Sequence, residues 1–214
     1  EVNNGLTCLY IITLAIDPNT PTTLYAGTLC GIFKSINGGE NWFEVNNGLP
    51  VAPVRALSGE NWFEVNNDLP VALVRALSID PEAPTTLYAG VDCYGVYKSV
   101  DGAESWAFSS TGLPDYACVT WLAIDPMSPT IVYVGIRTSS ADLYKSTNAG
   151  ESWDPSSTGL ITYGNMVVSL AIDPVTPTTL YAGTDNYGIF KSTNGGGSWE
   201  AANNGLTATN IQVL

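Results

Sequence analysis

Apolar and polar positions in this chain form short runs that alternate with clusters of turn residues. Toward the C-terminus, β-branched and aromatic residues gather in four such runs, at residues 167–172, 179–184, 188–192 and 198–202. Gly, Pro, Asn and Asp stand between the runs. Short runs of this composition, bounded by turn residues, are typical of β-strands joined in a meander rather than of helices. The pattern therefore predicts an all-β fold.

The four-strand unit recurs with a period of about 45 residues, which suits the blade of a β-propeller. The tripeptide Ile-Asp-Pro marks each unit and contributes Asp17, Asp80, Asp125 and Asp173. Each of these aspartates opens an Asp-Pro-x-x-Pro-Thr sequence. Two prolines fix φ there, and the aspartate side chain can close the turn by accepting backbone N–H groups. Because turn chemistry accounts for the aspartates, metal binding by them is the less favoured interpretation.

A duplication disturbs the first interval between markers, which is 63 residues long, whereas the next two are 45 and 48. Residues 39–58 and 59–78 are nearly identical and differ only at Gly48/Asp68 and Pro53/Leu73. Between the copies lie one inner strand, predicted at 51–57, and one outer strand, predicted at 61–65, without a middle pair. We expect a truncated blade here, with the turn at residues 58–60 joining the two strands into a ribbon.

A second motif is a turn that we call the box turn: serine, a spacer, Asn or Asp, a spacer, glycine, two residues and tryptophan. The side-chain oxygen of Asn or Asp can bind backbone N–H groups of the turn, the glycines supply positive φ, and the tryptophan anchors the outgoing strand by burial. The four copies are Ser35, Asn37 and Trp42; Ser99, Asp101 and Trp106; Ser146, Asn148 and Trp153; Ser192, Asn194 and Trp199.

These motifs resemble the Asp-box (BNR) repeat of sialidases, sortilin-like receptors, xyloglucanases and photosystem II assembly factors. The resemblance covers nearly the whole chain and implies a β-propeller with four-stranded antiparallel blades, in which the box is structural. We expect one domain over residues 1–214, with four complete blades and one truncated blade. Residues 1–6 and 210–214 align with an outer and an innermost strand, so the chain starts and stops within a blade. We therefore expect its ends to be covered by further blades of a larger ring, a second copy or an irregular closure.

Acidic residues outnumber basic ones, with 20 Asp plus Glu against 7 Lys plus Arg and a net charge of −13. Such a charge repels phosphate backbones and anionic lipid, so nucleic acid is not an expected partner. No apolar run approaches the roughly 18 residues of a membrane-spanning helix, so membrane insertion is not expected either.

The loops of a meander leave on two sides, and only one side varies from copy to copy. The Asp-Pro and box turns share the uniform side, whereas the loops after the second and fourth strands diverge. We call the latter the divergent face and expect a ligand there, because loops carry function on a rigid scaffold. The candidate ligand-binding residues are Asp92, Tyr94, Arg137, Asp185, Asn186 and Tyr187. No cofactor and no metal are expected.

The four cysteines, Cys8, Cys30, Cys93 and Cys118, also belong to the divergent side. Their spacing does not fit a zinc site. Proximity on one face favours pairing Cys8 with Cys30 and Cys93 with Cys118, and free buried thiols are the alternative.

The favoured function is a non-catalytic binding or scaffold propeller, secreted or on the cell surface, with a glycan or a protein or peptide as ligand. One alternative is a sialidase- or xyloglucanase-like carbohydrate hydrolase, and another is a membrane-protein assembly factor. Sialidases use three arginines around the substrate, but here Arg55 and Arg75 are duplicated copies of one position and only Arg137 remains beside them. The chain also has no histidine to act as a general base. No catalytic residue is therefore assigned.

Overall fold

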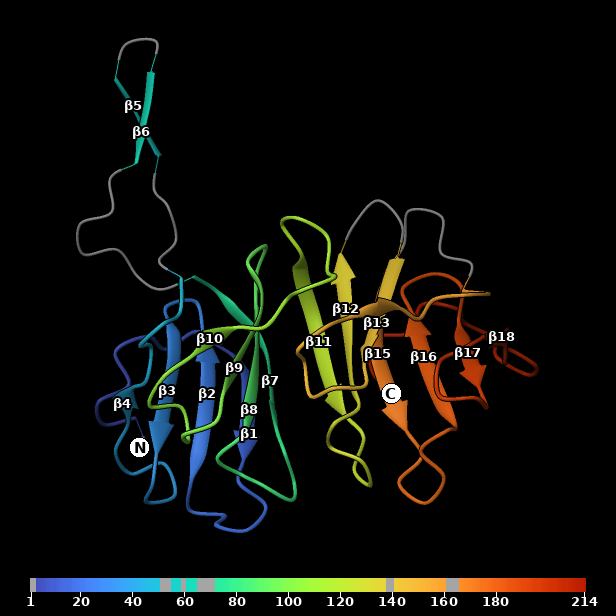
Figure 1. The fold of residues 1–214 in the computed structure, drawn as a ribbon, viewed down its shortest axis with the longest axis horizontal. Coiled ribbons are helices and arrows are strands. Elements are labelled where there is room, and N and C mark those ends of the chain that lie inside the picture. Colours follow the sequence, from blue (N-terminus) through green and yellow to red (C-terminus); the bar gives the residue numbers. More distant parts are fainter. Residues whose placement is uncertain (1–2, 51–54, 59–60, 65–71, 138–140, 161–165) are drawn as a thin grey trace.

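The computed structural model describes residues 3–50, 55–58, 61–64, 72–137, 141–160 and 166–214. In these residues the chain forms strands and turns and no helix. Four antiparallel four-stranded sheets follow one another along the sequence, and we call them blades 1 to 4 (Figure 1). Each blade takes its strands in sequence order, as a meander does. The prediction of an all-β fold with four complete blades is confirmed.

Blade 1 consists of β1 (Ile11–Ile16), β2 (Leu24–Thr28), β3 (Gly31–Ser35) and β4 (Phe43–Glu44); blade 2 of β7 (Val74–Ile79), β8 (Leu87–Val91), β9 (Gly95–Ser99) and β10 (Ala107–Phe108); blade 3 of β11 (Cys118–Ile124), β12 (Val132–Arg137), β13 (Ala141–Ser146) and β14 (Asp154–Pro155); blade 4 of β15 (Val167–Ile172), β16 (Leu180–Thr184), β17 (Ile189–Ser192) and β18 (Glu200–Ala201). In blade 4 the predicted bounds differ from the observed ones by at most two residues.

The innermost strands β1, β7, β11 and β15 contact one another in that order. Each blade packs against the one before it mainly through this strand. Val74, which is fully buried, and the partly buried Leu77 and Ile79 join a hydrophobic cluster with Tyr25 and Ile32 of blade 1. The corresponding residues of β11 pack in the same way on blade 2, and those of β15 pack on blade 3. Among the described residues β15 is not packed against β1, so the blades form an arc.

A tyrosine and a lysine of each of blades 1 to 3 also bind the box turn of the next blade. Tyr88 Oη and Lys98 Nζ donate hydrogen bonds of 3.0 and 2.8 Å to the carbonyl of Ala149. Tyr25 with Lys34 binds the carbonyl of Gly102, and Tyr133 with Lys145 that of Gly195. In the opposite direction, the indole N–H groups of the box tryptophans donate to carbonyls of the preceding blade, as Trp153 does to Ser109 at 2.7 Å. Consecutive blades are thus joined by polar contacts as well as by apolar packing.

The box turns owe their shape to hydrogen bonds of their own side chains. Ser99 Oγ donates to Asp101 Oδ1 at 2.7 Å and accepts from the N–H of Ala103 at 2.9 Å. The hydrogen bonds from the Ser105 hydroxyl and N–H, followed by that from Ser99, lower the pKa of Asp101 to about 2. Alanine replaces glycine at two positions of left-handed backbone, Ala103 (φ 72°) and Ala149 (φ 56°). The other three turns form the same serine and asparagine hydrogen bonds.

Three of the four box tryptophans are buried, as expected for anchors, namely Trp106, Trp153 and Trp199. Trp42 of blade 1 is only half-buried, because in the part of the chain that the structure describes no blade packs on that side of blade 1. The Asp-Pro turns match the expected turn chemistry. In the first, Asp17 Oδ1 accepts from the N–H groups of Asn19 and Thr20 at 2.8 and 3.0 Å, and the other three aspartates do the same.

The duplicated segment forms the expected two-stranded ribbon, in which β5 (Arg55–Ser58) pairs only with β6 (Asn61–Glu64). In Figure 1 this ribbon stands away from the blades. Blade 2 takes its innermost strand, β7, from the second copy. The copied segment also predicts that Trp62 takes a fifth place equivalent to the box tryptophans. Its strand, β6, belongs to the two-stranded sheet and is not the fourth strand of a blade, so this prediction is wrong for the strand, and the Trp62 side chain lies outside the described residues.

The chain ends lie beside blades 1 and 4 without forming regular strands. Asn4 makes an isolated parallel bridge with Asn41 and accepts from the N–H of Trp42 at 2.8 Å. Ile211 donates its N–H to the carbonyl of Thr184 at 2.9 Å, next to the inner edge of blade 4. Residues 210–214 therefore lie where the innermost strand of a further blade would pack, but they form no β-ladder.

Candidate binding face

The four innermost strands share a β-bulge near their beginning. In each blade the ladder between the first and second strands shifts at the same step, which leaves one residue without a direct partner. A bulge re-aims the side chain of the extra residue. The residues at this position are Ile12, Arg75, Thr120 and Val168. Blade 2 thus places an arginine where the other blades have threonine or an aliphatic residue.

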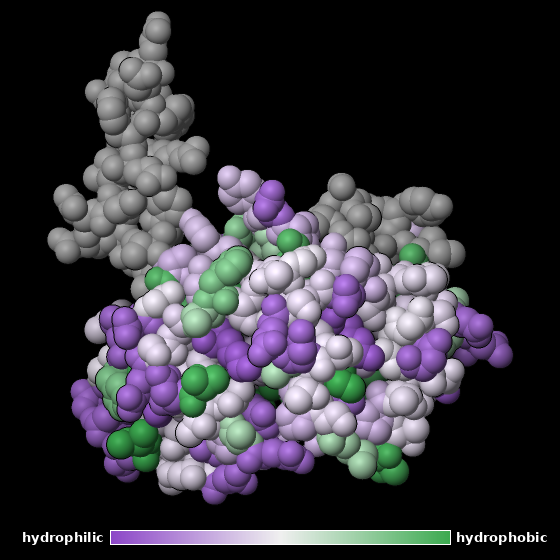
Figure 2. All heavy atoms as spheres, viewed as in Figure 1, coloured by the Kyte–Doolittle hydropathy of each residue, from purple (hydrophilic) through white to green (hydrophobic). Residues whose placement is uncertain are grey.

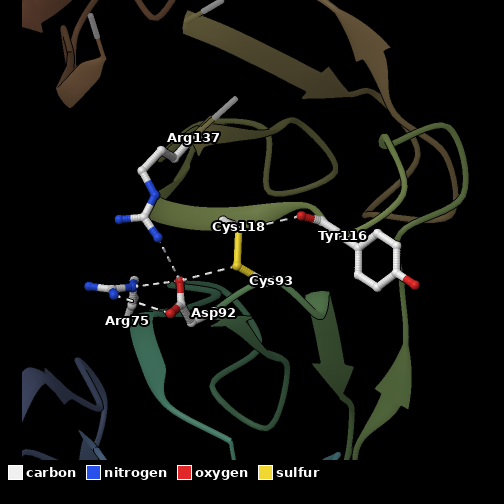
Figure 3. Close-up of a disulfide and its surroundings, with 6 residues drawn as sticks. All are labelled: Arg75, Asp92, Cys93, Tyr116, Cys118 and Arg137. Atoms are coloured by element: carbon white, nitrogen blue, oxygen red, sulfur yellow. Dashed lines mark hydrogen bonds and ion pairs between the residues drawn. A yellow bond between two sulfur atoms is a disulfide. The ribbon is translucent and has the colours of Figure 1, made fainter. Parts of the chain in front are cut away.

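Arg75 is directed toward Asp92, the first residue after β8. Its Nε and Nη2 donate to the two carboxylate oxygens at 2.8 and 3.2 Å, a bidentate arrangement. Nη2 of Arg137, the last residue of β12, lies 3.5 Å from Asp92 Oδ1. One carboxylate thus lies between two guanidinium groups from neighbouring blades (Figure 3). The cluster carries one excess positive charge, and the Arg137 side chain, 45% exposed, presents it to solvent.

A disulfide lies next to this cluster and joins blades 2 and 3. Cys93, next to Asp92, is bonded to Cys118 at the start of β11, and Cys8 is bonded to Cys30 in blade 1. These are the two pairs that proximity favoured among the possible pairings, and the alternative of free thiols is wrong. Asp92 with Cys93 and Cys118 is the one group of potential metal ligands in the part of the chain that the structure describes. Since both sulfurs are used in the disulfide, they offer no thiolate to an ion.

A hollow of about 340 Å³ opens beside the disulfide. Four aromatic residues line it, namely Tyr94, Tyr97, Phe108 and Tyr116. Tyr97 and Phe108 meet edge to face, with ring centroids 5.6 Å apart, and burial raises the pKa of Tyr97. Tyr116 is 85% exposed at the rim. The hollow therefore offers aromatic surface, and Cys93 in its wall is the neighbour of Asp92, which binds the partly exposed guanidinium group of Arg137.

The backbone around the hollow is strained at two residues. Cys93 and Tyr116 both have positive φ, 58° and 57°. Non-glycine residues adopt this conformation at a cost of about 1–3 kcal/mol, and such residues cluster at functional sites. The disulfide and the turn before β11 hold both residues in place.

The remaining candidate residues do not join this cluster. Asp185, which corresponds to Asp92 in blade 4, accepts from the N–H of Met166 at 3.0 Å, since its bulge residue is Val168 rather than arginine. Asn186 is exposed beside it. Tyr187 is half-buried and packs on the core between blades 3 and 4. Blade 3 separates these three residues from Asp92.

Of the six predicted residues, the structure therefore brings together Asp92 and Arg137, with Tyr94 in the adjoining hollow. Tyr94 is also half-buried against the core between blades 1 and 2. Sequence reasoning missed Arg75 and Tyr116. A signal for Arg75 was present, because it is the only charged residue in its inner strand, β7.

No known protein family matches the sequence, and no curated protein sequence matches it either. Solved structures do match. An ancestral GH74 enzyme superposes with a TM-score of 0.66 at 23% identity, over 92% of this chain and 24% of that one. A GH74 enzyme from Niastella koreensis gives 0.63 at 20% identity, over 87% and 28%. YCF48, in a structure titled as bound to D1 peptide, gives 0.58 at 11% identity, over 92% and 54%.

The fold is that of a β-propeller. These similarities concern the fold alone, because all three sequence identities are below 25%. This propeller chain spans about a quarter of the length of the two GH74 structures and about half of the YCF48 chain. Within the described residues it contains no helix of the length and apolarity needed to cross a bilayer.

Proposed function

We propose that this propeller is a non-catalytic binding module of the Asp-box type that holds a peptide segment of a partner protein on its divergent face. The observation that carries the proposal is the cluster of Arg75, Asp92 and Arg137 beside the aromatic hollow. Aromatic and arginine side chains dominate the energetics of protein recognition sites. Of the solved structures that share the fold, YCF48 is described as bound to a peptide.

The charge distribution limits the kind of peptide. With a net charge of −13, the protein repels polyanionic segments at long range. The single excess positive charge at Arg137 suits one carboxylate or a few backbone carbonyls, and the hollow suits an apolar or aromatic side chain. The two disulfides support a location in an oxidising compartment, secreted or on the cell surface.

The test is a screen of random heptapeptides with free carboxyl termini, followed by calorimetry on the best binder. Arg137→Gln and Tyr116→Ala should each weaken binding by about tenfold or more, as truncation of an interface hot spot does. Neither should change the melting temperature, because both side chains are exposed. Met127→Ala is the matched control, since Met127 is 61% exposed but lies in an Asp-Pro turn on the opposite side. Unchanged binding in both site variants would refute the proposed site.

A carbohydrate hydrolase is the second candidate, because the two GH74 enzymes superpose better than YCF48 does. Hydrolysis of a glycosidic bond needs a pair of carboxyl groups. On this face, Asp115 lines the hollow and Asp92 lies in the cluster. Release of reducing ends from xyloglucan or from a sialylated oligosaccharide, abolished by Asp115→Asn or Asp92→Asn, would replace the binding module with an enzyme.

A further inference from the structure

The first blade presents an apolar face that every other blade buries. Leu9, Ile11, Leu14 and Ile16 occupy the repeat positions of Ala72, Val74, Leu77 and Ile79, which pack on the preceding blade. In blade 1 these side chains are 68%, 41%, 55% and 53% exposed. By contrast, the surface seen in Figure 2 carries hydrophobic residues only in small separate groups. The apolar face of β1 is thus a blade-binding surface without a blade on it.

The last blade presents the matching polar groups. Tyr181 and Lys191 occupy the positions of Tyr88 and Lys98, and the Lys191 Nζ again lies over the tyrosine ring, 5.5 Å from its centroid. Among the described residues neither group has a box-turn carbonyl to bind. A box-turn carbonyl without a donor from a preceding blade lies at the other end of the arc that the structure describes. It belongs to Gly38, the counterpart of Gly102, Ala149 and Gly195. Gly38 is exposed, whereas Gly102 and Gly195 are buried under the preceding blade.

We propose that the two ends bind each other between two copies of this chain, so that blade 4 of one copy stacks on blade 1 of the other. The three junctions within the chain are the template for this contact, in both apolar packing and hydrogen bonds. Two such junctions close a symmetric ring of eight blades, which is within the range of known propellers. Tyr181 and Lys191 then donate to Gly38 of the partner copy, and β1 of each copy is buried.

One segment must move for this contact to form. Residues 203–214 repeat residues 3–14, and both begin Asn-Asn-Gly-Leu-Thr. Ile211 and Leu214 lie over Gly183 of blade 4 as Val74 lies over Gly27 of blade 1, so they occupy part of the place of an incoming β1. Residues 210–214 have no ladder, and Val213 is 76% exposed. β1 is paired with β2 and flanked by the Cys8–Cys30 disulfide. The incoming β1 therefore displaces residues 207–214, which act as a removable cap.

Sedimentation velocity of the 214-residue protein over a range of concentrations, in high salt to screen the negative charge, tests the association. We expect a monomer–dimer equilibrium. Leu14→Glu should weaken it by about tenfold or more, because the contact would bury an unpaired charge. Met127→Glu is the control, since Met127 is 61% exposed but lies in the Asp-Pro turn of blade 3, which is at neither end of the arc. Removal of residues 207–214 should strengthen the dimer.

The head-to-tail direction has its own test. Leu14→Glu damages blade 1 and Lys191→Glu damages blade 4, so each variant alone should be monomeric. An equimolar mixture should dimerise, because it retains one intact junction. A monomeric wild-type protein that stays monomeric without residues 207–214 would overturn the proposal. So would a Leu14→Glu dimer of wild-type affinity, or a mixture that fails to associate although the wild type does.

Discussion

Replacing Tyr88 with phenylalanine should destabilise the propeller by about 1 kcal/mol, the net value of one intramolecular hydrogen bond. The side chain is fully buried, and its hydroxyl donates to the carbonyl of Ala149 at 3.0 Å. That carbonyl keeps a second donor, Lys98 Nζ at 2.8 Å. The substitution therefore removes one hydrogen bond without leaving a buried acceptor unsatisfied, which sets the cost at about 0.5–1.5 kcal/mol.

Tyr181→Phe provides the matched control, because Tyr181 occupies the same repeat position in blade 4 but binds no box turn among the described residues. At concentrations where the protein is monomeric, its free energy of unfolding should change by less than about 0.5 kcal/mol. Urea denaturation followed by both circular dichroism and tryptophan fluorescence measures the two values and tests for a single transition. In a thermal scan the Tyr88 variant should melt about 2–4 °C lower.

Equal destabilisation by the two substitutions would refute the reasoning, since the hydroxyl would then act within its own blade rather than across the junction. If Tyr88→Phe left the free energy of unfolding unchanged, the hydrogen bond from Lys98 alone would suffice to hold the box turn of the next blade.

Two further predictions concern solution conditions. Burial, followed by the nearby Asp-Pro aspartate, raises the pKa of Tyr25, Tyr88 and Tyr133 to about 12. Burial keeps these three tyrosines neutral in the folded state, so their contribution to the free energy of unfolding is complete below pH 10. That contribution is lost between pH 10 and about 12, where the urea midpoint should fall as tyrosine absorbance at 295 nm rises. Non-reducing peptide mapping by mass spectrometry should find Cys93 linked to Cys118, and four alkylatable thiols in the native protein would contradict both this pairing and export.

The blades could be predicted from the sequence because their turns are local. Asp17 closes its turn with residues two and three positions away, and Ser99 and Asp101 bond within the same box. Such short-range chemistry is visible in the residue order itself. The two-stranded ribbon was predictable for the same reason, since the duplicated piece holds only two strands and a short turn.

The site could be predicted only in part, because its contacts depend on how blades sit beside each other. The approach of Arg137 to Asp92 joins two blades, and the direction of Arg75 depends on a bulge that strand alternation does not reveal. The half-burial of Trp42 likewise depends on a neighbour that is missing rather than on its own motif. Tyr187 fits the divergent loop in sequence, yet its ring packs into the core.

The junction between blades 1 and 2 shows how freely this architecture accepts foreign sequence. The N–H of Ala72 donates to the carbonyl of Pro50 at 3.0 Å, so residues 51–71 leave and re-enter the fold at one point. A segment between these two residues need not match the blades, because its two ends already meet and cost little entropy to close. An engineer could exchange the ribbon for a tag, an epitope or a whole folded domain whose termini lie close together. The hydrogen bond between Ala72 and Pro50 thus marks a position in a β-propeller at which added sequence need not disturb the packing between blades.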